Sequence, residues 1–361
     1  MLKNKILIVG GYGQVGKYVT LELIQKFPDK IIVAGRDLNK ANSFAKEYDN
    51  SFETIKLDIY ELENIATSLN GIKVVIMCLS PKNNDFAKYC IENGIHYIDI
   101  SPSNDIVKNI EQFGKEAGNK KSTCVLGVGL APGLSNLLVK NLYQKMDILH
   151  EVNISLMLGI GETHGNDGIN WLLDNIQSDF FVRNKKTKPF TKGKKVIFIK
   201  NLGKRKAYPF NLADQFIIPK TLKIENVSSY FCYDSRIVTI YVSLLKHMGI
   251  FGLLKYRSIY KIISTFFSVT LHIIQKLKLG SDVYSIKVDA VGIKQNKRFI
   301  CNAGIIGNNN SLLTAKIASF VAVKLYMENN SFGVFYLEEL FSLEDLNNYG
   351  ICTEIEILEE V

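Results

Sequence analysis

The chain is poor in tryptophan, proline, histidine and cysteine. Its 361 residues include one tryptophan, seven prolines, five histidines and six cysteines. Seven prolines and 26 glycines are too few for a collagen-like or low-complexity chain. The cysteines form no CxxC pair and have no histidine at zinc-site spacing, which argues against a structural zinc site and a disulfide scaffold. We therefore expect no metal site, and free thiols in a reducing, cytoplasmic compartment.

Long hydrophobic runs are also lacking. The uncharged stretch 122–139 is interrupted by glycines and a proline, and 262–275 is too short to cross about 30 Å of hydrocarbon. The apolar run Ile6–Val9 is too short for a signal sequence and predicts a first strand instead. The sequence therefore predicts no membrane-spanning segment.

Acidic residues are absent from two basic segments. Residues 183–206 carry 11 Lys and Arg and residues 246–278 carry six, in a chain whose formal net charge is +9. One interpretation is a solvated surface; the other is an anionic partner, namely a substrate carboxylate, a phosphate or a membrane surface. Residues 246–278 have apolar residues at helical spacing, which predicts an interfacial helix, a lid or a dimer contact. Residues 183–206 predict a basic hairpin.

Strand-like and helix-like patterns alternate over the first 128 residues. Such alternation is typical of an α/β fold with a doubly wound parallel sheet, the Rossmann arrangement. Longer strand-like stretches follow, among them 152–159, 238–243 and 283–292, and predict a second α+β domain with a mixed or antiparallel sheet. We expect a dinucleotide-binding domain over 1–130, a substrate and dimerisation domain over 131–310, and a C-terminal segment over 311–361 that packs back on the first domain.

A glycine-rich turn follows the first predicted strand and opens a predicted helix. Its glycines would allow a tight turn, a close approach of the backbone to a pyrophosphate, and close packing of helix on strand. The helix N-terminus would add backbone N–H groups and a partial positive charge. A purely structural turn is the alternative interpretation. The predicted cofactor contacts in this turn are Gly11, Tyr12, Gly13, Gln14, Val15 and Gly16.

The end of the second predicted strand favours NADP over NAD. An NAD site usually carries an acid at that point, but this strand ends at Ala34-Gly35 and Arg36 follows. An arginine there can pair with a 2′-phosphate, or it can be a solvated turn residue. Asp37 could instead accept from the ribose. Asp58 closes the third strand and is expected either near the adenine or as a helix cap.

Several segments of the chain match one known pattern. They are GGYGQVG at 10–16, AGRDLNKA at 34–41, CLSP at 78–81, CIENGIHYIDIS at 90–101 and GLAPGLSNLL at 129–138, with sparser matches at 164–171, 288–292 and 333–339. With these segments, and above all with a HYID strand followed by a PGLSN turn, the sequence resembles the saccharopine dehydrogenase family, in its reductase form with an N-terminal Rossmann domain.

The resemblance implies a Rossmann domain, an inserted substrate and dimerisation domain, and NAD(P)-linked oxidoreduction at a carbon–nitrogen bond. It also implies a homodimer that acts on a small, anionic molecule and does not bind nucleic acid. The chain keeps the aspartate of the HYxD strand as Asp99. It has Cys78 where the family has a tyrosine and Val128 where the family has a cysteine. These departures argue against a role in lysine metabolism.

Hydride transfer to an imine requires a bound cofactor ring, a proton source and cations for substrate carboxylates. Leu79, Ser80 and Ser101 follow parallel strands at their carboxyl ends, where open α/β sheets bind ligands, so we expect them near the cofactor. Asp99 ends such a strand. It would orient or protonate a substrate amine, or it would be a structural residue bonded to backbone amides.

Two further groups are candidates in the second domain. His164 lies in a glycine-rich loop and is the candidate general acid, with a solvent-facing loop histidine as the alternative. Gly133, Ser135 and Asn136 begin a helix whose N–H groups suit a substrate carboxylate, although helix initiation alone explains them equally well.

The sequence thus predicts a cytoplasmic NADP-dependent oxidoreductase that carries out reductive amination, or its reverse, on an amino-acid or polyamine-like substrate. A membrane-surface reductase of a lipid-like substrate, which would contact anionic membranes through 183–206 and 246–278, is one alternative. A non-catalytic NAD(P)-binding sensor or scaffold is the other.

Overall fold

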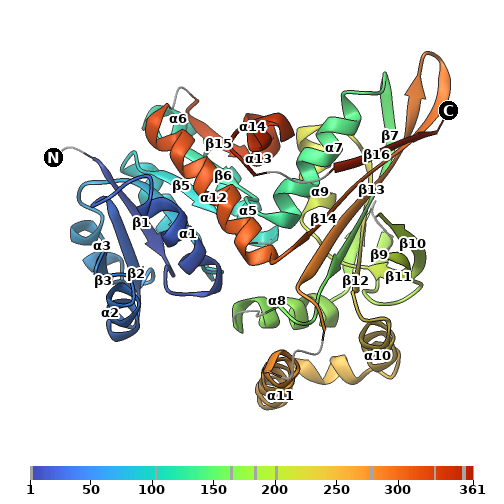
Figure 1. Ribbon diagram of the computed structural model, residues 1–361, viewed down its shortest axis with the longest axis horizontal. Coiled ribbons are helices and arrows are strands. Elements are labelled where there is room, and N and C mark those ends of the chain that lie inside the picture. The colour runs from blue at the N-terminus through green and yellow to red at the C-terminus, as the bar shows by residue number, and fades with distance from the viewer. Residues whose placement is uncertain are drawn as a thin grey trace. The chain divides into compact units, whose positions relative to one another are not determined.

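The chain folds into two compact units, which Figure 1 shows by element. The computed structural model describes residues 3–101, 104–162, 166–182, 185–199, 202–276, 280–328, 331–351 and 355–360. The first unit comprises Met1–Gly133, Ser311–Phe341 and Asn348–Ile351. The second comprises Leu134–Asn310, Ser342–Asn347 and Cys352–Val361.

The first unit is built on a seven-stranded parallel sheet with the strand order β15-β6-β5-β4-β1-β2-β3. The predicted doubly wound parallel sheet is therefore confirmed. Its strands are β1 (Lys5–Val9), β2 (Ile31–Gly35), β3 (Glu53–Lys56), β4 (Ile72–Met77), β5 (His96–Asp99), β6 (Thr123–Leu126) and β15 (Gly333–Tyr336).

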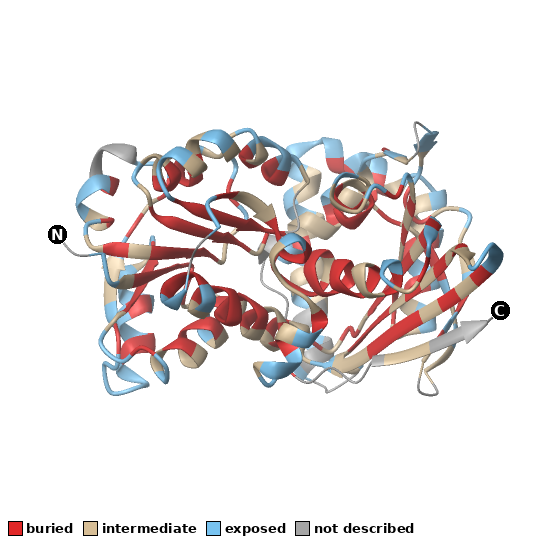
Figure 2. Ribbon diagram, turned by 90° about the horizontal axis from the view of Figure 1, so that it is seen from above, coloured by how far each residue is buried: buried red, intermediate tan, exposed pale blue. Residues whose placement is uncertain are grey.

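Helices cover both faces of this sheet, above and below the buried strands in Figure 2. The central strands β1, β2 and β4 are short apolar runs, and nearly every residue in them is buried, as expected when both faces of a parallel sheet are covered. The helices are α1 (Gln14–Ile24), α2 (Leu38–Lys46), α3 (Leu62–Ser68), α4 (Asp85–Glu92), α5 (Asn104–Glu111), α6 (Gly114–Asn119), α12 (Asn310–Met327) and α13 (Leu337–Leu340).

The C-terminal part of the chain is divided between the units. Strand β15 extends the first sheet by pairing in parallel with β6, so that Val334 lies opposite Cys124. Strand β16 (Ile355–Glu360) instead pairs with β14 of the second unit. The first unit therefore draws one edge strand from a segment some 200 residues away in sequence.

The second unit is built on a mixed seven-stranded sheet, as predicted, with the order β10-β11-β12-β7-β13-β14-β16. Strands β12 and β7 pair in parallel, and the other neighbours are antiparallel. A separate hairpin joins β8 (Phe180–Val182) and β9 (Lys185–Thr187). The strands of the main sheet besides β16 are β7 (Ile148–Leu158), β10 (Lys194–Phe198), β11 (Gly203–Pro209), β12 (Asn226–Tyr233), β13 (Val283–Lys294) and β14 (Lys297–Asn308).

Helices α7 and α9 pack on this sheet, and α8, α10 and α11 form a cluster of their own beside β7 and β12. In the described part of the chain, no helix is both long enough and apolar enough to cross a membrane. The helices are α7 (Ser135–Tyr143), α8 (Asn166–Gln177), α9 (Asp214–Thr221), α10 (Arg236–His247), α11 (Arg257–Lys276) and α14 (Leu343–Asn348), with a 3₁₀ turn at Ile250–Lys255.

One local prediction is wrong. Residues 238–243 are rich in β-branched side chains and were expected to form a strand, but they lie within α10. Ser235 caps this helix by accepting a hydrogen bond from the Val238 N–H. Strand propensity depends on packing, and here Thr239 and Val242 are buried at helical spacing, so tertiary contacts decide the conformation.

The basic segment 183–206 contains the predicted hairpin, because β10 and β11 pair antiparallel within its described residues. Some of its cations pack on the protein itself. The Lys194 Nζ lies 3.8 Å from the centroid of the Tyr230 ring, and the Arg205 Nε donates to the Asp234 carbonyl at 3.3 Å.

Candidate functional site

In the turn between β1 and α1, backbone packs directly against backbone. A Cβ added to Gly16 would lie 2.2 Å from the Gly10 carbonyl oxygen and 2.7 Å from the Gly11 Cα, so no side chain fits there. Gly13 caps α1 without a side-chain hydrogen bond, and the first turn of the helix has no acidic residue. The N-terminus of α1 therefore offers backbone N–H groups to an anion, and the turn fits the pyrophosphate of a dinucleotide.

The end of β2 brings Tyr12 and Arg36 to the same edge of the sheet. The Tyr12 ring packs on Gly35, where an added Cβ would lie 2.4 Å from the ring, and the Tyr12 hydroxyl accepts from the Asp37 N–H at 3.1 Å. Arg36 is exposed. The Asp37 carboxylate accepts from the Lys40 N–H at 3.1 Å and so caps α2. Asp37 thus has the role of a helix cap, and the exposed Arg36 side chain is accessible to a phosphate.

A polar cavity of about 380 Å³ adjoins this edge. Two of the residues that line it, Lys17 and Lys40, were not singled out from the sequence. The Lys17 Nζ lies 5.3 Å from the centroid of the Phe44 ring, and the Lys40 Nζ lies 3.7 Å from an Asp37 carboxylate oxygen. With Arg36 they give this edge three cations, which suits a 2′-phosphate. The lining residues are Tyr12, Lys17, Asp37, Asn39, Lys40, Ser43, Phe44 and Glu47.

The other predicted cofactor contacts lie at the carboxyl ends of β3 and β4. Asp58 follows β3 and accepts from the Tyr60 N–H at 3.1 Å, so it forms a turn ahead of α3. Leu79 follows β4 and packs on the glycine turn, because a Cβ added to Gly10 would lie 2.6 Å from its side chain. Ser80 is exposed beside it. Leu79 and Ser80 are therefore next to the dinucleotide turn.

Asp99 ends β5 and is fully buried. Its carboxylate accepts from the Ser101 N–H at 2.6 Å and from the Tyr97 hydroxyl at 3.1 Å. Burial raises the pKa of this carboxyl to about 7, and the two hydrogen bonds oppose that shift. Burial, with the Asp99 charge as a second cause, also raises the pKa of the neighbouring Cys78 thiol. These contacts agree with the alternative interpretation of the sequence, in which Asp99 is a structural residue bonded to backbone amides. Its carboxylate fixes the turn at Ser101.

The turn between β6 and α7 holds the predicted substrate residues. Gly133 has φ +125°, and an added Cβ would lie 2.8 Å from the Gly127 carbonyl oxygen. Ser135 and Asn136, at the start of α7 in the second unit, are buried. The Ser135 hydroxyl donates to the carboxylate of Asp214 on α9, a residue that the sequence did not point to. Burial raises the pKa of Asp214 to about 6, and its second oxygen is buried without a hydrogen bond.

His164 lies outside the described residues. Among those that are described, no group of three or more His, Cys, Asp or Glu side chains could hold a metal ion. The five described cysteines are free thiols.

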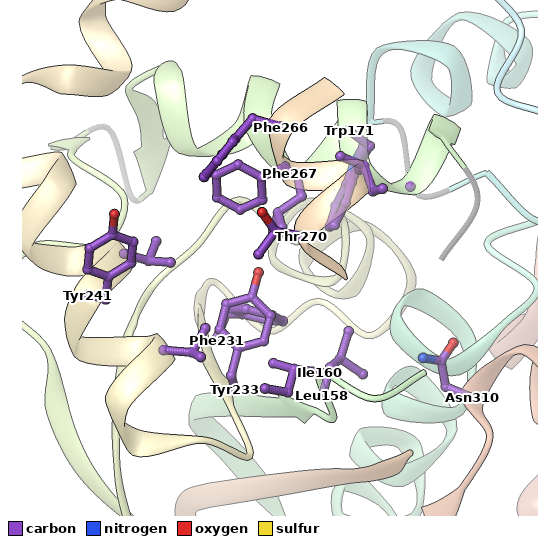
Figure 3. A pocket seen from close by; sticks show the side chains of 15 residues that line it. Leu158, Ile160, Trp171, Phe231, Tyr233, Tyr241, Phe266, Phe267, Thr270 and Asn310 are labelled. Carbon is purple, nitrogen blue, oxygen red and sulfur yellow. The ribbon is translucent and has the colours of Figure 1, made fainter. Parts of the chain in front are cut away.

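The second unit contains an apolar cavity of about 280 Å³, shown in Figure 3. Most of its wall comes from β7, β12, α8, α10 and α11, and Ile160 and Asn310 complete it. Leu158 and Tyr233 lie opposite each other in the register of β7 and β12, and Phe267 and Thr270 reach the same space from α11. The lining residues are Leu158, Ile160, Gly168, Ile169, Trp171, Leu172, Phe231, Tyr233, Val238, Tyr241, Val242, Phe266, Phe267, Thr270 and Asn310.

The chemistry of this lining is almost entirely apolar. None of the described residues that form it is charged, and its polar groups are hydroxyls, one amide and the indole N–H. Its volume is close to the lower end of the range of small-molecule pockets, about 300–1,000 Å³. Such a cavity suits an aliphatic or aromatic group and not a carboxylate or ammonium group.

Comparisons with known proteins agree with the architecture of the first unit. Residues 6–125 match the family model described as the saccharopine dehydrogenase NADP binding domain. Glutamyl-tRNA reductase of Methanosphaera stadtmanae is 30% identical over 125 residues, which are 33% of this chain and 30% of that protein. Shikimate dehydrogenase (NADP(+)) of Methanobrevibacter smithii is 29% identical over 90 residues, 24% of this chain and 32% of that one. The matched stretch thus spans about a third of each curated relative.

The fold of the whole chain is also found in a solved structure. Saccharopine dehydrogenase (L-Glu forming) from Saccharomyces cerevisiae superposes with a TM-score of 0.69 at 13% identity, covering 99% of this chain and 100% of that one. The predicted resemblance to the saccharopine dehydrogenase-like family is thereby confirmed: the family model matches residues 6–125, and the superposition shows the same fold over the whole chain.

Proposed function

We propose that this chain, whose residues 6–125 belong to the saccharopine dehydrogenase NADP-binding domains, is an NADP-dependent oxidoreductase. The observation that carries the proposal is the glycine turn after β1. There, backbone packed against backbone leaves the N-terminus of α1 open to a pyrophosphate. Arg36, Lys17 and Lys40 are the residues we assign to the 2′-phosphate.

NADP, when bound, supplies the hydride donor or acceptor. The chain's own residues have to position it and the substrate. Leu79, which packs on the glycine turn, and Ser80 beside it are placed to line the cofactor site. Asp99 acts as a positioning residue, because its buried carboxylate holds the Ser101 N–H and does not face solvent. His164 is the proposed proton donor on the grounds of sequence alone.

The proposed reaction is hydride transfer at a carbon–nitrogen bond of an amine or imine, which the family resemblance favours. The apolar cavity supports a substrate with a sizeable apolar group, since its described lining has no cation to bind a carboxylate. We therefore favour an amine, or the corresponding imine, that carries an alkyl or aromatic chain. This combines the predicted C–N chemistry with the lipid-like substrate of the alternative prediction.

The test has two arms. The first measures oxidation of NADPH with alkyl aldehydes mixed with ammonia or an amino acid, and reduction of NADP⁺ with alkylamines. Rates that rise with alkyl chain length are expected. Binding of NADPH with no turnover on any of these mixtures would favour the sensor or scaffold, and absence of NADPH binding would contradict the proposal.

The second arm uses Trp171, the chain's single tryptophan, which lines the cavity. A brominated fatty acid such as 12-bromododecanoic acid should quench its fluorescence with saturation, because bromine in the cavity would touch the indole. Dodecanoic acid without bromine is the control for indirect changes in fluorescence. An unquenched Trp171 would show that the cavity does not take an alkyl chain, whatever the result with NADPH.

A further inference from the structure

We propose that α10, the following 3₁₀ turn and α11 form a docking surface for an anionic lipid membrane. We call it the α10–α11 surface and define it by the exposed side chains of residues 236–276. The proposal concerns location and does not depend on the reaction proposed above. Figure 1 shows α10 and α11 as neighbours within the second unit.

Helix α11 presents an apolar stripe to solvent. Ile262, Phe266, Val269 and Ile273 are each at least half exposed, and their spacing of four, three and four residues places them along one side of the helix. Ile262 has 68% of its surface accessible. An ordinary surface helix would place polar residues at these positions, so this stripe requires a partner.

Helix α10 carries a second stripe of the same kind. Ile237, Ile240, Tyr241, Leu244 and Met248 follow helical spacing and are all more than half exposed, with Ile237 at 80%. The 3₁₀ turn between the helices adds the exposed side chains of Leu253 and Tyr256 at its end. The apolar side chains therefore continue from one helix to the next.

The opposite sides of α10 and α11 already pack against the second unit. The exposed stripes are therefore not the sides by which these helices contact the core. The Ser264 hydroxyl of α11 donates to the Asn170 side chain on α8 at 2.8 Å. On α10, the Lys246 Nζ donates to the Ile176 and Gln177 carbonyls at 2.6 and 3.1 Å, at the C-terminal end of α8. Burying the stripes against the protein itself would break these contacts.

The charge of the surface identifies the partner. From Arg236 to Lys276 the chain has six Lys or Arg and no Asp or Glu. Lys255, Arg257 and Lys261 are exposed beside the apolar side chains. An apolar stripe flanked by cations matches the interface of an anionic bilayer, where acyl chains meet negatively charged headgroups.

A second copy of this chain fits the surface less well. A twofold contact would place the same patch on both subunits and bring twelve cations together without an acid from this segment. An anionic membrane supplies the missing negative charge. The proposed partner is therefore an anionic lipid membrane, and the sedimentation measurement below distinguishes it from self-association.

The apolar cavity opens at this same surface. Tyr241 of α10 and Phe266 of α11 both line the cavity and are both more than half exposed, so they form its rim. Figure 3 shows them on the side of the cavity away from Leu158 and Ile160. A docked molecule would thus present the cavity mouth to the acyl layer, from which an apolar chain could enter without crossing water.

The experiment is vesicle flotation of the full chain. Phosphatidylcholine vesicles with and without phosphatidylserine are compared at about 50 mM and about 300 mM salt, since screening over a Debye length weakens binding of exposed charges. We expect binding to the anionic vesicles, at least about fivefold stronger at the lower salt. Absence of flotation with anionic vesicles at low salt would overturn the proposal.

Two sets of variants locate the contact. Ile262→Ser, Val269→Ser and Ile273→Ser together remove apolar side chains that do not line the cavity, and should lower binding at least about tenfold. The matched control replaces exposed apolar residues elsewhere in the second unit, Ile148→Ser and Phe181→Ser, and should leave binding unchanged. Equal loss in both sets would overturn the assignment to this surface.

The charges are tested in the same way. Lys255→Gln, Arg257→Gln and Lys261→Gln should lower binding about tenfold or more. The control removes the same number of exposed cations from the basic hairpin, with Lys195→Gln, Lys204→Gln and Lys206→Gln. If the hairpin set has the larger effect, or if sedimentation shows a dimer that only the α11 variants break, the α10–α11 surface is not a membrane site.

Discussion

The two large sheets of the molecule have seven strands each, but the candidate sites beside them are built in different ways. In the first unit every strand is parallel, and the site lies at the turns that leave the carboxyl ends of β1, β2, β4 and β5. The candidate site there is formed mostly by backbone, through N–H groups and the space that glycines leave open. In the second unit the strands are mixed, and the cavity lies where side chains of two strands and three helices meet.

Because of this difference, the two units tolerate different kinds of substitution. A site made of backbone is sensitive to any added Cβ and indifferent to most side chains that point away from it. A cavity made of side chains keeps its fold when its lining changes, but it changes its ligand. Each unit also contains a fully buried carboxyl group whose pKa is raised, Asp99 in the first and Asp214 in the second. The two units can therefore be perturbed and followed separately.

The largest effect is expected from pH. Asp99 has an ordinary pKa of 3.8 and a folded-state pKa of about 7, because burial disfavours its charge. Below about pH 4 the carboxyl is protonated in the folded and in the unfolded chain. There the contribution of the protonated Asp99 to the stability of the folded state is fully present. Between pH 4 and 7 the unfolded chain releases the proton and the folded chain keeps it, so the free energy of unfolding falls. The fall is on the order of 3 kcal/mol, and Asp99→Asn should abolish it.

Urea titrations across this pH range measure the fall by circular dichroism, while Trp171 fluorescence follows the second unit alone. Asp214→Asn is the matched variant, since the pKa of Asp214 is raised to about 6. Asp214→Asn should remove the pH dependence, between pH 4 and 6, of the unfolding free energy that Trp171 fluorescence reports. It should leave the stability of the first unit unchanged. A pH dependence that survives both substitutions would show that these carboxyls do not hold the protons in the folded state.

Gly16→Ala comes next. The added Cβ would lie 2.2 Å from the Gly10 carbonyl oxygen, so the turn must move and its N–H groups with it. NADPH affinity, measured from the nucleotide's fluorescence, should fall at least about a hundredfold, or about 2.8 kcal/mol. Gly114→Ala on α6 is the control, because nothing lies within 4 Å of its added Cβ. Quenching of Trp171 by the brominated fatty acid should persist in both variants.

The contrast between the units also explains what the sequence can reveal. The dinucleotide turn is a local feature in which strand, glycines and helix are adjacent along the chain, so the glycine spacing in that context predicted Gly11–Gly16 as cofactor contacts. The parallel sheet around it was predicted from the alternation of strands and helices. Lys17 and Lys40 belong to the same region but were not singled out. Their relation to the cavity depends on how α1 and α2 pack, and no spacing rule contains that information.

In the second unit the sequence predicted a mixed or antiparallel sheet, the basic hairpin and the helical segment at 246–278, but it did not predict the cavity, for a physical reason. Its cavity is lined by residues from Leu158 to Asn310, and no short segment contains enough of them to form a pattern. Residues 238–243 show the same limit, because their β-branched side chains predict a strand and only the packing of Thr239 and Val242 makes them helical. Asp214 likewise became visible only through its partner Ser135.

Thr270→Phe should have a moderate effect on the second unit alone. The side chain lies in the cavity, so a phenyl group there fills space that an alkyl chain would occupy. Quenching of Trp171 by the brominated fatty acid should require about thirtyfold more ligand, or about 2 kcal/mol, while NADPH affinity stays the same. Thr265→Phe, at an exposed position of the same helix, controls for a general effect of the added ring. Unchanged quenching would place the alkyl chain outside the cavity.

The smallest effect is expected at Arg36, where the first unit does depend on a side chain. NADPH should bind at least about tenfold more tightly than NADH, because Arg36 is exposed at the end of β2 and no acid replaces it at Ala34 or Gly35. Arg36→Ala should remove most of that preference, about 1.4 kcal/mol for a factor of ten, and leave NADH affinity unchanged. Lys30→Ala, at the residue just before the same strand, is the control. If the preference survives in Arg36→Ala and disappears in Lys17→Ala or Lys40→Ala, the 2′-phosphate lies in the polar cavity beside α2. Its recognition then depends on helix packing, as the proposed binding of an alkyl chain does in the second unit.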